Sequence, residues 1–277
     1  AGHVVVMYKN RISMTFTLVL SALILLGIAH AHAYSGSWDS EWPKTDFDKH
    51  NVDLGEIFSG GPPKDGIPAI DDPKFRPVAE IDDLGPQEPV IALSVNEETK
   101  AYPLRILMWH EIVNDTIGGV PVTVTYCPLC NSSIVFDRRL DGQVLDFGTT
   151  GKLRNSDLVM YDRQSESWWQ QFIGEGIVGV MTGKELKILP SRLESFERFK
   201  KRAPYAKVLV PNTLNFRSYG NNPYAGYDSR KRPYGFFKGD LPEGINAMVR
   251  IVVVDGEAWS LPLLRSKGVI DVGDGVE

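Results

Sequence analysis

Two cysteines, Cys127 and Cys130, are the only thiols of the chain, and they stand three positions apart in the segment VTYCPLCNSS. Such a pair can close a disulfide, exchange electrons, or supply two sulfur ligands to a metal ion. A disulfide across so short a loop restricts the unfolded chain only slightly. A redox pair usually precedes a helix, whereas NSSIVFDRR, which follows here, is typical of a strand. The Cys-Pro-Leu-Cys-Asn turn therefore favours a metal knuckle, with a disulfide, a thiol-disulfide oxidoreductase and inert buried thiols as alternatives.

A histidine and a glutamate, His110 and Glu111, interrupt the otherwise apolar segment LRILMWHEIV, 17 residues before Cys127. Buried ionisable groups must be hydrogen-bonded, paired or bound to a metal. Neighbouring backbone groups or an arginine can satisfy them, but the nearby cysteines favour a shared site. Thiolate together with imidazole suits copper or zinc. We predict a metal site of Cys127, Cys130, His110 and Glu111, with copper preferred to zinc.

Polar and aromatic residues also gather further along the chain, in and just before two expected strands, DLVMYDR and WWQQFIG. The members of this cluster are Asn155, Asp157, Tyr161, Asp162, Arg163, Trp168 and Trp169. They can cap the end of a sheet, or the aromatic rings can form a platform for a sugar or peptide. No glycine-rich phosphate loop, Gly-x-Ser-x-Gly elbow or His-Glu-x-x-His pair occurs, so no nucleotide cofactor is indicated and the catalytic residues stay unknown.

The first 33 residues have the features of a secretory signal peptide. Lys9 and Arg11 precede an apolar run from Thr15 to Ala29, and Ala31-His32-Ala33 matches a cleavage site. We expect cleavage near Ala33 and a secreted or periplasmic protein without a stable membrane span. Cleavage would remove two positive charges and move the formal net charge from -5 to -7. An acidic chain of this kind is a poor candidate for binding nucleic acid.

The remaining sequence predicts a β-rich α+β fold. Residues 34–83 are rich in Pro, Gly and Asp and predict an irregular arm, and residues 84–277 predict one domain. A hairpin is expected in 89–104, followed by a buried helix of about three turns that ends at Gly118-Gly119. Five strands and a tight turn at Asp141-Gly142 come next. A second, amphipathic helix is expected in 190–204, capped by Ser191 and Glu194.

One pattern occurs twice. Residues 90–107 and 250–265 share an apolar strand, an acidic turn, an Ala-aromatic pair and an apolar stretch that contains Pro-Leu. Any hairpin followed by a helix resembles this order, so chance similarity is the alternative to an internal duplication. A duplication would place two related units around one core.

Three long motifs carry a resemblance to a known family. They are the His110-Glu111 pair, Tyr126 to Cys130, and NSDLVMYDR from Asn155 to Arg163, with NPYAGY (Asn222 to Tyr227) further on. From about Gly66 to Val272 the chain closely resembles the secreted bacterial and archaeal family catalogued as domain of unknown function 3179. The chain has Asn131 where that family usually has glycine. The resemblance implies no settled activity.

Two functions of different class therefore follow from the residues. The first is an extracytoplasmic metal protein, either a carrier or an oxidoreductase. The second is a non-catalytic secreted binding module with a Cys127-Cys130 disulfide and a ligand platform formed by Trp168, Trp169 and Tyr161. A thiol-disulfide oxidoreductase is the third alternative, and the partner, whether a small molecule or a protein, stays unknown.

Overall fold

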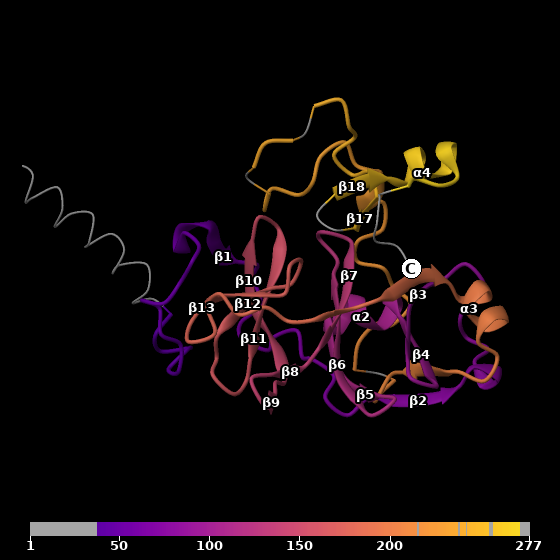
Figure 1. Ribbon diagram of the computed structural model, residues 1–277, viewed down its shortest axis with the longest axis horizontal. Helices are drawn as coiled ribbons and strands as arrows, with labels where there is room; N and C mark the ends of the chain where they lie inside the picture. Colours follow the sequence, from indigo (N-terminus) through magenta and orange to yellow (C-terminus); the bar gives the residue numbers. More distant parts are fainter. Residues whose placement is uncertain (1–37, 215, 238, 242, 255–256, 272–277) are drawn as a thin grey trace, which may run out of the picture.

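A computed structural model describes residues 38–271 except 215, 238, 242, 255 and 256. The expected signal peptide lies outside the described residues. Most of the described strands form three sheets, which stand from left to right in Figure 1. The first sheet has the strand order β1 (Ile57–Ser59), β10 (Phe147–Arg154), β11 (Asp157–Asp162), β12 (Trp168–Gln170) and β13 (Glu175–Val178).

The second and third sheets complete the main body of the fold. The second has the order β14 (Ile188–Leu189), β7 (Ser132–Asp137), β6 (Val120–Cys127) and β5 (Ile112–Ile117). The third has the order β15 (Ser191–Ser195), β3 (Pro89–Val95), β4 (Glu98–Pro103), β16 (Lys207–Val210) and β2 (Lys74–Pro77). The described residues also contain three short helices, so the expected β-rich α+β class is confirmed.

A shared apolar core joins the first and second sheets. It contains Ile112, Cys127 and Phe136 from the second sheet, packed with Phe147, Leu158, Met160 and Trp169 from the first. The side chain of Cys127 is therefore part of the packing between two sheets. Burial of this kind is worth about 25 cal/mol per Å² of apolar surface removed from water.

The helix before the cysteines is shorter than predicted. The helix α2 spans Leu104–His110 and buries Leu104, Ile106 and Leu107, but it ends at Glu111, whose φ of 59° is left-handed. The next residues form β5, which pairs with β6. The expected three-turn helix is wrong because β-branched residues such as Ile112 and Val113 are well suited to a buried strand.

The second helix begins later than the sequence indicated. Ser191, expected as its cap, lies in β15, and the helix α3 spans Phe196–Arg202. The side chain of Ser195 accepts a hydrogen bond from the backbone N–H of Arg198, so Ser195 is the cap. The capping-box prediction is wrong because β15 pairs with β3 and needs these residues extended.

The segment 34–83 also has more regular structure than expected. Its described part contains β1, which belongs to the first sheet, and β2, which belongs to the third. It also contains two short 3-10 helices, η1 (Leu54–Glu56) and η2 (Val78–Glu80). The turn at Asp141-Gly142 is confirmed between β8 (Arg139–Leu140) and β9 (Gln143–Val144). Both turn residues have positive φ, as a tight two-residue hairpin requires.

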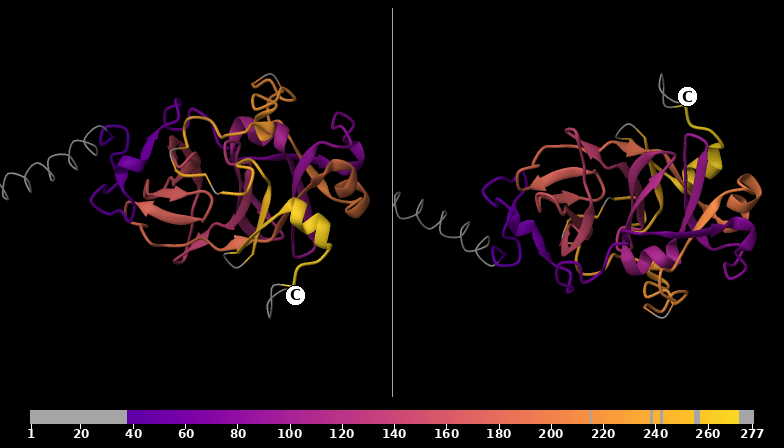
Figure 2. Two further views of the ribbon diagram at one scale, coloured as in Figure 1. Left: turned by 90° about the horizontal axis from the view of Figure 1, so that it is seen from above. Right: turned by 90° about the horizontal axis from the view of Figure 1, so that it is seen from below.

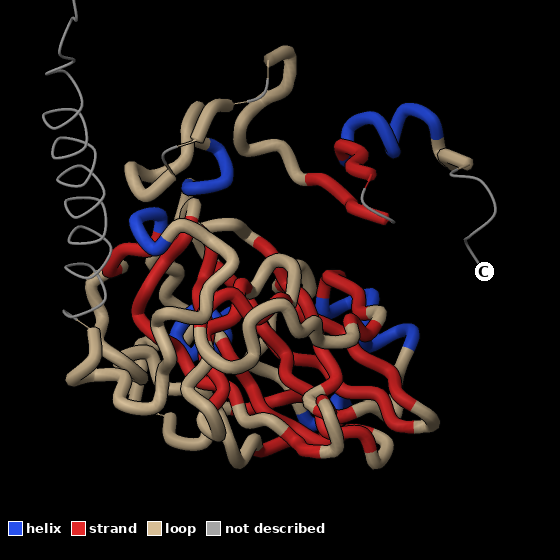
Figure 3. The backbone as a smooth tube through the Cα atoms, turned by 60° about the vertical axis from the view of Figure 1, so that its left-hand side comes forward, coloured by secondary structure: helices blue, strands red, loops and turns tan. Residues whose placement is uncertain are grey.

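The repeated pattern produces the same elements twice. The first copy is β3, β4 and α2, and the second is β17 (Ile251–Val254), β18 (Glu257–Ser260) and α4 (Leu261–Lys267). The second copy stands apart from the main body in Figure 3, and α4 lies at the margin of the molecule in both views of Figure 2. Among the described residues, no helix has both the length and the apolar character that crossing a membrane requires.

Candidate metal centre

A tight turn between two paired strands holds the two cysteines. Cys127 ends β6 and lies opposite Ser132, the first residue of β7. Asn131 closes the turn with a φ of 53°, a conformation that Asn adopts more readily than most residues. Its side-chain oxygen accepts a hydrogen bond of 3.1 Å from the hydroxyl of Tyr126. The turn between Cys127 and Ser132 is therefore tight, as the sequence predicts.

Both thiols are free and point at each other. The Sγ atoms of Cys127 and Cys130 are 2.8 Å apart, and the backbone N–H of Cys130 donates to Cys127 Sγ at 3.4 Å. The carbonyl oxygen of Ser156 lies 3.7 Å from Cys127 Sγ and 3.5 Å from Cys130 Sγ. Two sulfurs and one carbonyl oxygen thus converge on one point of the turn.

An acidic residue from another sheet joins the thiols. Asp157 begins β11, and its Oδ1 lies 3.0 Å from Cys130 Sγ. The ligand atoms of Cys127, Cys130 and Asp157 all lie within 4.8 Å of one another. Such a group could hold a metal ion. Asn155 and Ser156 place Asp157 there through consecutive positive φ angles of 53° and 67°, which make the tight turn between β10 and β11.

The pKa values of the acidic groups of this site are all raised. Burial raises the pKa of Cys127 and of Asp157. The hydrogen bond with Cys127, together with burial, raises the pKa of Cys130 well above its ordinary value. Burial and the charge of Asp157 raise the pKa of Glu111 to about 8. Among the described residues, no lysine or arginine forms an ion pair with Asp157 or Glu111, so nothing cationic offsets their burial.

Glu111 lies beside the thiols at the end of α2. Its carbonyl accepts a hydrogen bond of 2.8 Å from the backbone N–H of Tyr126, the residue before Cys127. Its side chain is buried, and its charge acts on the pKa of Cys127. Its carboxyl is not one of the three groups within 4.8 Å of one another. Glu111 is therefore a neighbour of the three-residue group.

His110 is held elsewhere. Its Nδ1 lies 2.7 Å from the carbonyl oxygen of Pro68, and its Nε2 lies 2.6 Å from the hydroxyl of Tyr219. Its ring also stacks on the rings of Tyr219 and Phe216. Because both ring nitrogens have these partners, the structure does not bring His110 to the cysteines. Burial lowers its pKa, which favours the neutral ring.

The predicted polar and aromatic cluster separates into different environments. Asp157 joins the cysteines and Asn155 lies exposed in the turn before it. Tyr161 donates to Asp65 at 2.5 Å, and Arg163 pairs with Asp71 at 2.7 Å.

The two tryptophans of that cluster lie in the core. Asp162 accepts a hydrogen bond of 2.9 Å from the indole N–H of Trp169, and both Trp168 and Trp169 have no exposed surface. The ligand platform predicted for Trp168, Trp169 and Tyr161 is therefore wrong, because these side chains pack in the core.

A family comparison agrees with the motifs around this site. Residues 64–277 match the model of a family described as protein of unknown function (DUF3179). The chain belongs to this family. The match covers nearly the same residues as the predicted resemblance, from Gly66 to Val272. Neither a curated protein nor a solved structure matches the chain.

Another motif of the family lies close to the thiols. Tyr224 and Tyr227 belong to NPYAGY, and Tyr227 is buried and stacks on Tyr234 with ring centroids 4.2 Å apart. Burial and the charges of Glu111 and Cys127 raise the pKa of Tyr224 to about 12. The motif is evident in the sequence, but nothing in the sequence connects it to the cysteines. Tyr224 and Cys127 are about 100 positions apart in the sequence, and only the fold brings them together.

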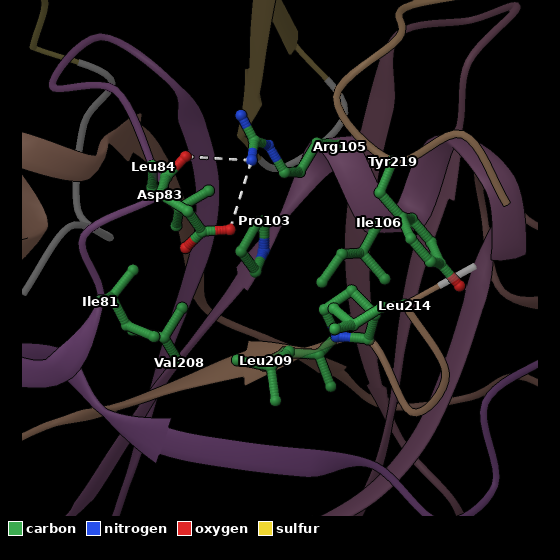
Figure 4. Close-up of a pocket in the computed structure, with 12 residues that line it drawn as sticks. Ile81, Asp83, Leu84, Pro103, Arg105, Ile106, Val208, Leu209, Leu214 and Tyr219 are labelled. Carbon is green, nitrogen blue, oxygen red and sulfur yellow. Dashed lines mark hydrogen bonds and ion pairs between the residues drawn. The ribbon is translucent and has the colours of Figure 1, made fainter. Parts of the chain in front are cut away.

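A separate cavity of about 180 Å³ lies between the third sheet and α2. Its lining is mostly apolar and includes Pro103, Ile106 and Leu214, with the ring of Tyr219 at one side (Figure 4). Arg105 turns toward Asp83 and pairs with it at 3.6 Å. The lining contains neither cysteine nor Asp157, so this cavity is distinct from the candidate metal centre.

Proposed function

We propose that this member of the family binds a transition metal ion through Cys127 Sγ, Cys130 Sγ and Asp157 Oδ1, with Glu111 completing a set of four ligands. The convergence of the first three ligand atoms within 4.8 Å carries the proposal. Two strands of different sheets present these atoms from a tight turn and a strand start, so the protein core fixes their spacing. Rigid placement of this kind is what a metal site needs.

The acidic groups gathered at this site favour the binding of a cation. The two carboxyls and the Cys127 thiol are buried, the Cys130 thiol beside them is half-buried, and the pKa values of all four groups are raised. A bound metal ion would stabilise the deprotonated forms, because thiolates and carboxylates are the ligating species. Binding would then release protons, and the affinity would rise with pH.

The donor set favours zinc over copper. The predicted site, with copper preferred to zinc, included the imidazole of His110, but both ring nitrogens of His110 have other partners. Zinc accepts cysteine sulfur and carboxylate oxygen together in tetrahedral sites. Because the first 33 residues have the features of a secretory signal peptide, we place this function outside the cytoplasm, as metal carriage or as metal-dependent oxidoreductase chemistry.

Metal content measured on residues 34–277, purified without a histidine tag, tests the proposal. We expect about one zinc per chain after loading, with both thiols free of disulfide. Asp157→Asn and Cys130→Ser should lower the zinc content at least about tenfold at limiting metal, because each removes a ligand. Asp162→Asn is the matched control, since Asp162 ends the same strand, is also buried and bonds Trp169.

Two results would contradict the proposal. One is a full zinc content in Asp157→Asn and Cys130→Ser. The other is equal loss in Asp162→Asn, which would trace the loss to general destabilisation of β11.

Thiol-disulfide exchange is the second candidate, favoured by the 2.8 Å between the two Sγ atoms. In that reaction the two thiols would reduce an external disulfide, forming the Cys127-Cys130 bond and releasing two small thiols. Against it, burial raises the pKa of Cys127, and β7 rather than a helix follows the turn. A thiol count after treatment with oxidised glutathione separates the two functions, because bound zinc should protect both thiols.

A further inference from the structure

One carboxylate oxygen of Asp157 accepts hydrogen bonds from two donors. Its Oδ2 accepts a hydrogen bond from the side-chain Nε2 of Gln170, and a second of 3.0 Å from the backbone N–H of Phe172. A carboxylate oxygen has two lone pairs, so these donors use the acceptor capacity of Oδ2. Only Oδ1 faces the thiols, at 3.0 Å from Cys130 Sγ.

The side chain of Gln170 is itself held in one orientation. Its Oε1 accepts a hydrogen bond of 3.2 Å from Arg154 Nη1, which leaves the amide nitrogen turned toward Asp157. Arg154 in turn bonds Glu56 through Nε at 2.8 Å and Nη2 at 2.7 Å. A chain of contacts therefore runs from η1 through β10 and β12 to the candidate metal centre.

We infer that Gln170 is a positioning residue that restricts Asp157 to binding the metal through Oδ1 alone. The inference rests on the proposed function. With Oδ2 held by Gln170 and Phe172, the carboxylate cannot rotate to offer both oxygens to an ion. Hydrogen-bonded partners of ligating carboxylates orient them in this way, and their loss typically weakens metal affinity by about 10-fold to 100-fold.

Binding through one oxygen of Asp157 also makes the site selective among metal ions. Calcium takes six to eight oxygen ligands and often binds carboxylates through both oxygens. Zinc in a four-ligand tetrahedral site needs one atom from each residue. Gln170 therefore favours a small ion with four ligands over a larger ion with more.

Cobalt spectroscopy on the purified chain tests this role, because the visible absorption of Co²⁺ is stronger in a four-ligand tetrahedral site than in a five-ligand site. Gln170→Leu should bind Co²⁺ about 10-fold to 100-fold more weakly and show a weaker visible band per bound ion.

Gln171→Leu is the matched control. Gln171 is the next residue, is also buried, and its side-chain amide hydrogen-bonds Thr125 at 2.8 Å and Ser132 at 2.7 Å rather than Asp157. We expect Gln171→Leu to keep the wild-type spectrum, because its loss leaves Asp157 held at Oδ2.

Arg154→Met provides a second variant at a partly exposed position, for the case in which Gln170→Leu does not fold. It removes the group that orients Gln170 and should weaken the visible band in the same direction by a smaller amount. A wild-type spectrum and affinity in Gln170→Leu, or in Arg154→Met if that alone folds, would overturn the inference while leaving the metal site intact. A wild-type chain that takes up no Co²⁺ would instead overturn the proposed function, and the inference with it.

Discussion

The two hairpin-helix units, β3-β4-α2 and β17-β18-α4, have the same order of elements and helices of equal length, yet different surroundings. In the first, β15 and β16 flank the hairpin, and α2 buries four of its side chains. In the second, β17 and β18 form a two-stranded sheet, and α4 has no buried residue. Local sequence thus suffices to produce a hairpin and a helix, whereas burial depends on strands that arrive from distant parts of the chain.

The helix ends make the comparison sharper. The C-cap of α4 is Gly268, with a φ of 77°, and its N–H bonds the carbonyl oxygen of Leu264. The C-cap of α2 is Glu111, with a φ of 59°, and its N–H bonds the carbonyl oxygen of Leu107. Glycine suits this conformation because it has no Cβ. The first unit therefore carries a strained, buried glutamate beside the thiols where the second has the residue that fits best.

The largest expected difference between the units is in packing. Ile106 and Leu263 are the third residues of α2 and α4, with exposed fractions of 1% and 40%. Ile106→Ala should lower the free energy of unfolding by about 2–5 kcal/mol, because it removes most of a buried side chain and enlarges the cavity that Ile106 lines. Leu263→Ala should lower it by less than about 1 kcal/mol. Urea unfolding of both variants measures the difference, and equal losses would mean that α4 is as well packed as α2.

The hairpins β3-β4 and β8-β9 could be predicted because they depend on local patterns. Alternating apolar residues and Asp141-Gly142 identified hairpins correctly. The end of α2 could not be predicted, since a continuous apolar run is compatible with a helix or a buried strand. Strand pairing with β6 decided between them at Ile112. Pairing with β3 likewise overrode the capping pattern at Ser191.

The candidate site was predictable in part. The turn at Cys127 and Cys130 was expected, but Asp157 was assigned to another cluster, because only folding shows which sheets pack together. His110 and Glu111 were expected to share one ion. His110 is the last residue of α2, whereas Glu111 follows it with a φ of 59° that does not continue the helix. His110 therefore turns to Tyr219 while Glu111 stays beside Cys127.

A second prediction concerns the titration of Glu111 in the metal-free protein. Its pKa in the folded state is about 8, above the ordinary value of 4.5, so the folded state binds its proton more tightly than the unfolded state. The stability from this proton is complete below pH 4.5 and is lost as pH rises through 8. The free energy of unfolding of Glu111→Gln should therefore exceed that of wild type by roughly a few kcal/mol at pH 9 and differ little from it at pH 4.

Urea unfolding with a chelator present, between pH 4 and pH 9, measures this effect. If Glu111→Gln and wild type lose stability in parallel across that range, then Glu111 is not the group that titrates. The proposed ligand role adds a second readout, because Glu111→Gln should also bind zinc more weakly while its metal-free form is more stable.

The smallest expected effect comes from replacing Gly268, the C-cap of α4, with glutamate, the residue at the C-cap of α2. Gly268→Glu places a side chain at a φ of 77° and should lower the free energy of unfolding by about 1 kcal/mol. Because Gly268 is exposed, the new carboxylate stays in water, and the loss should be the same at pH 4 and pH 9. Gly268→Ala separates backbone strain from charge, since it should lose a similar amount. A loss that grows with pH in Gly268→Glu would show that this helix end alone, without burial beside thiols, perturbs a glutamate, and the comparison between the units would fail.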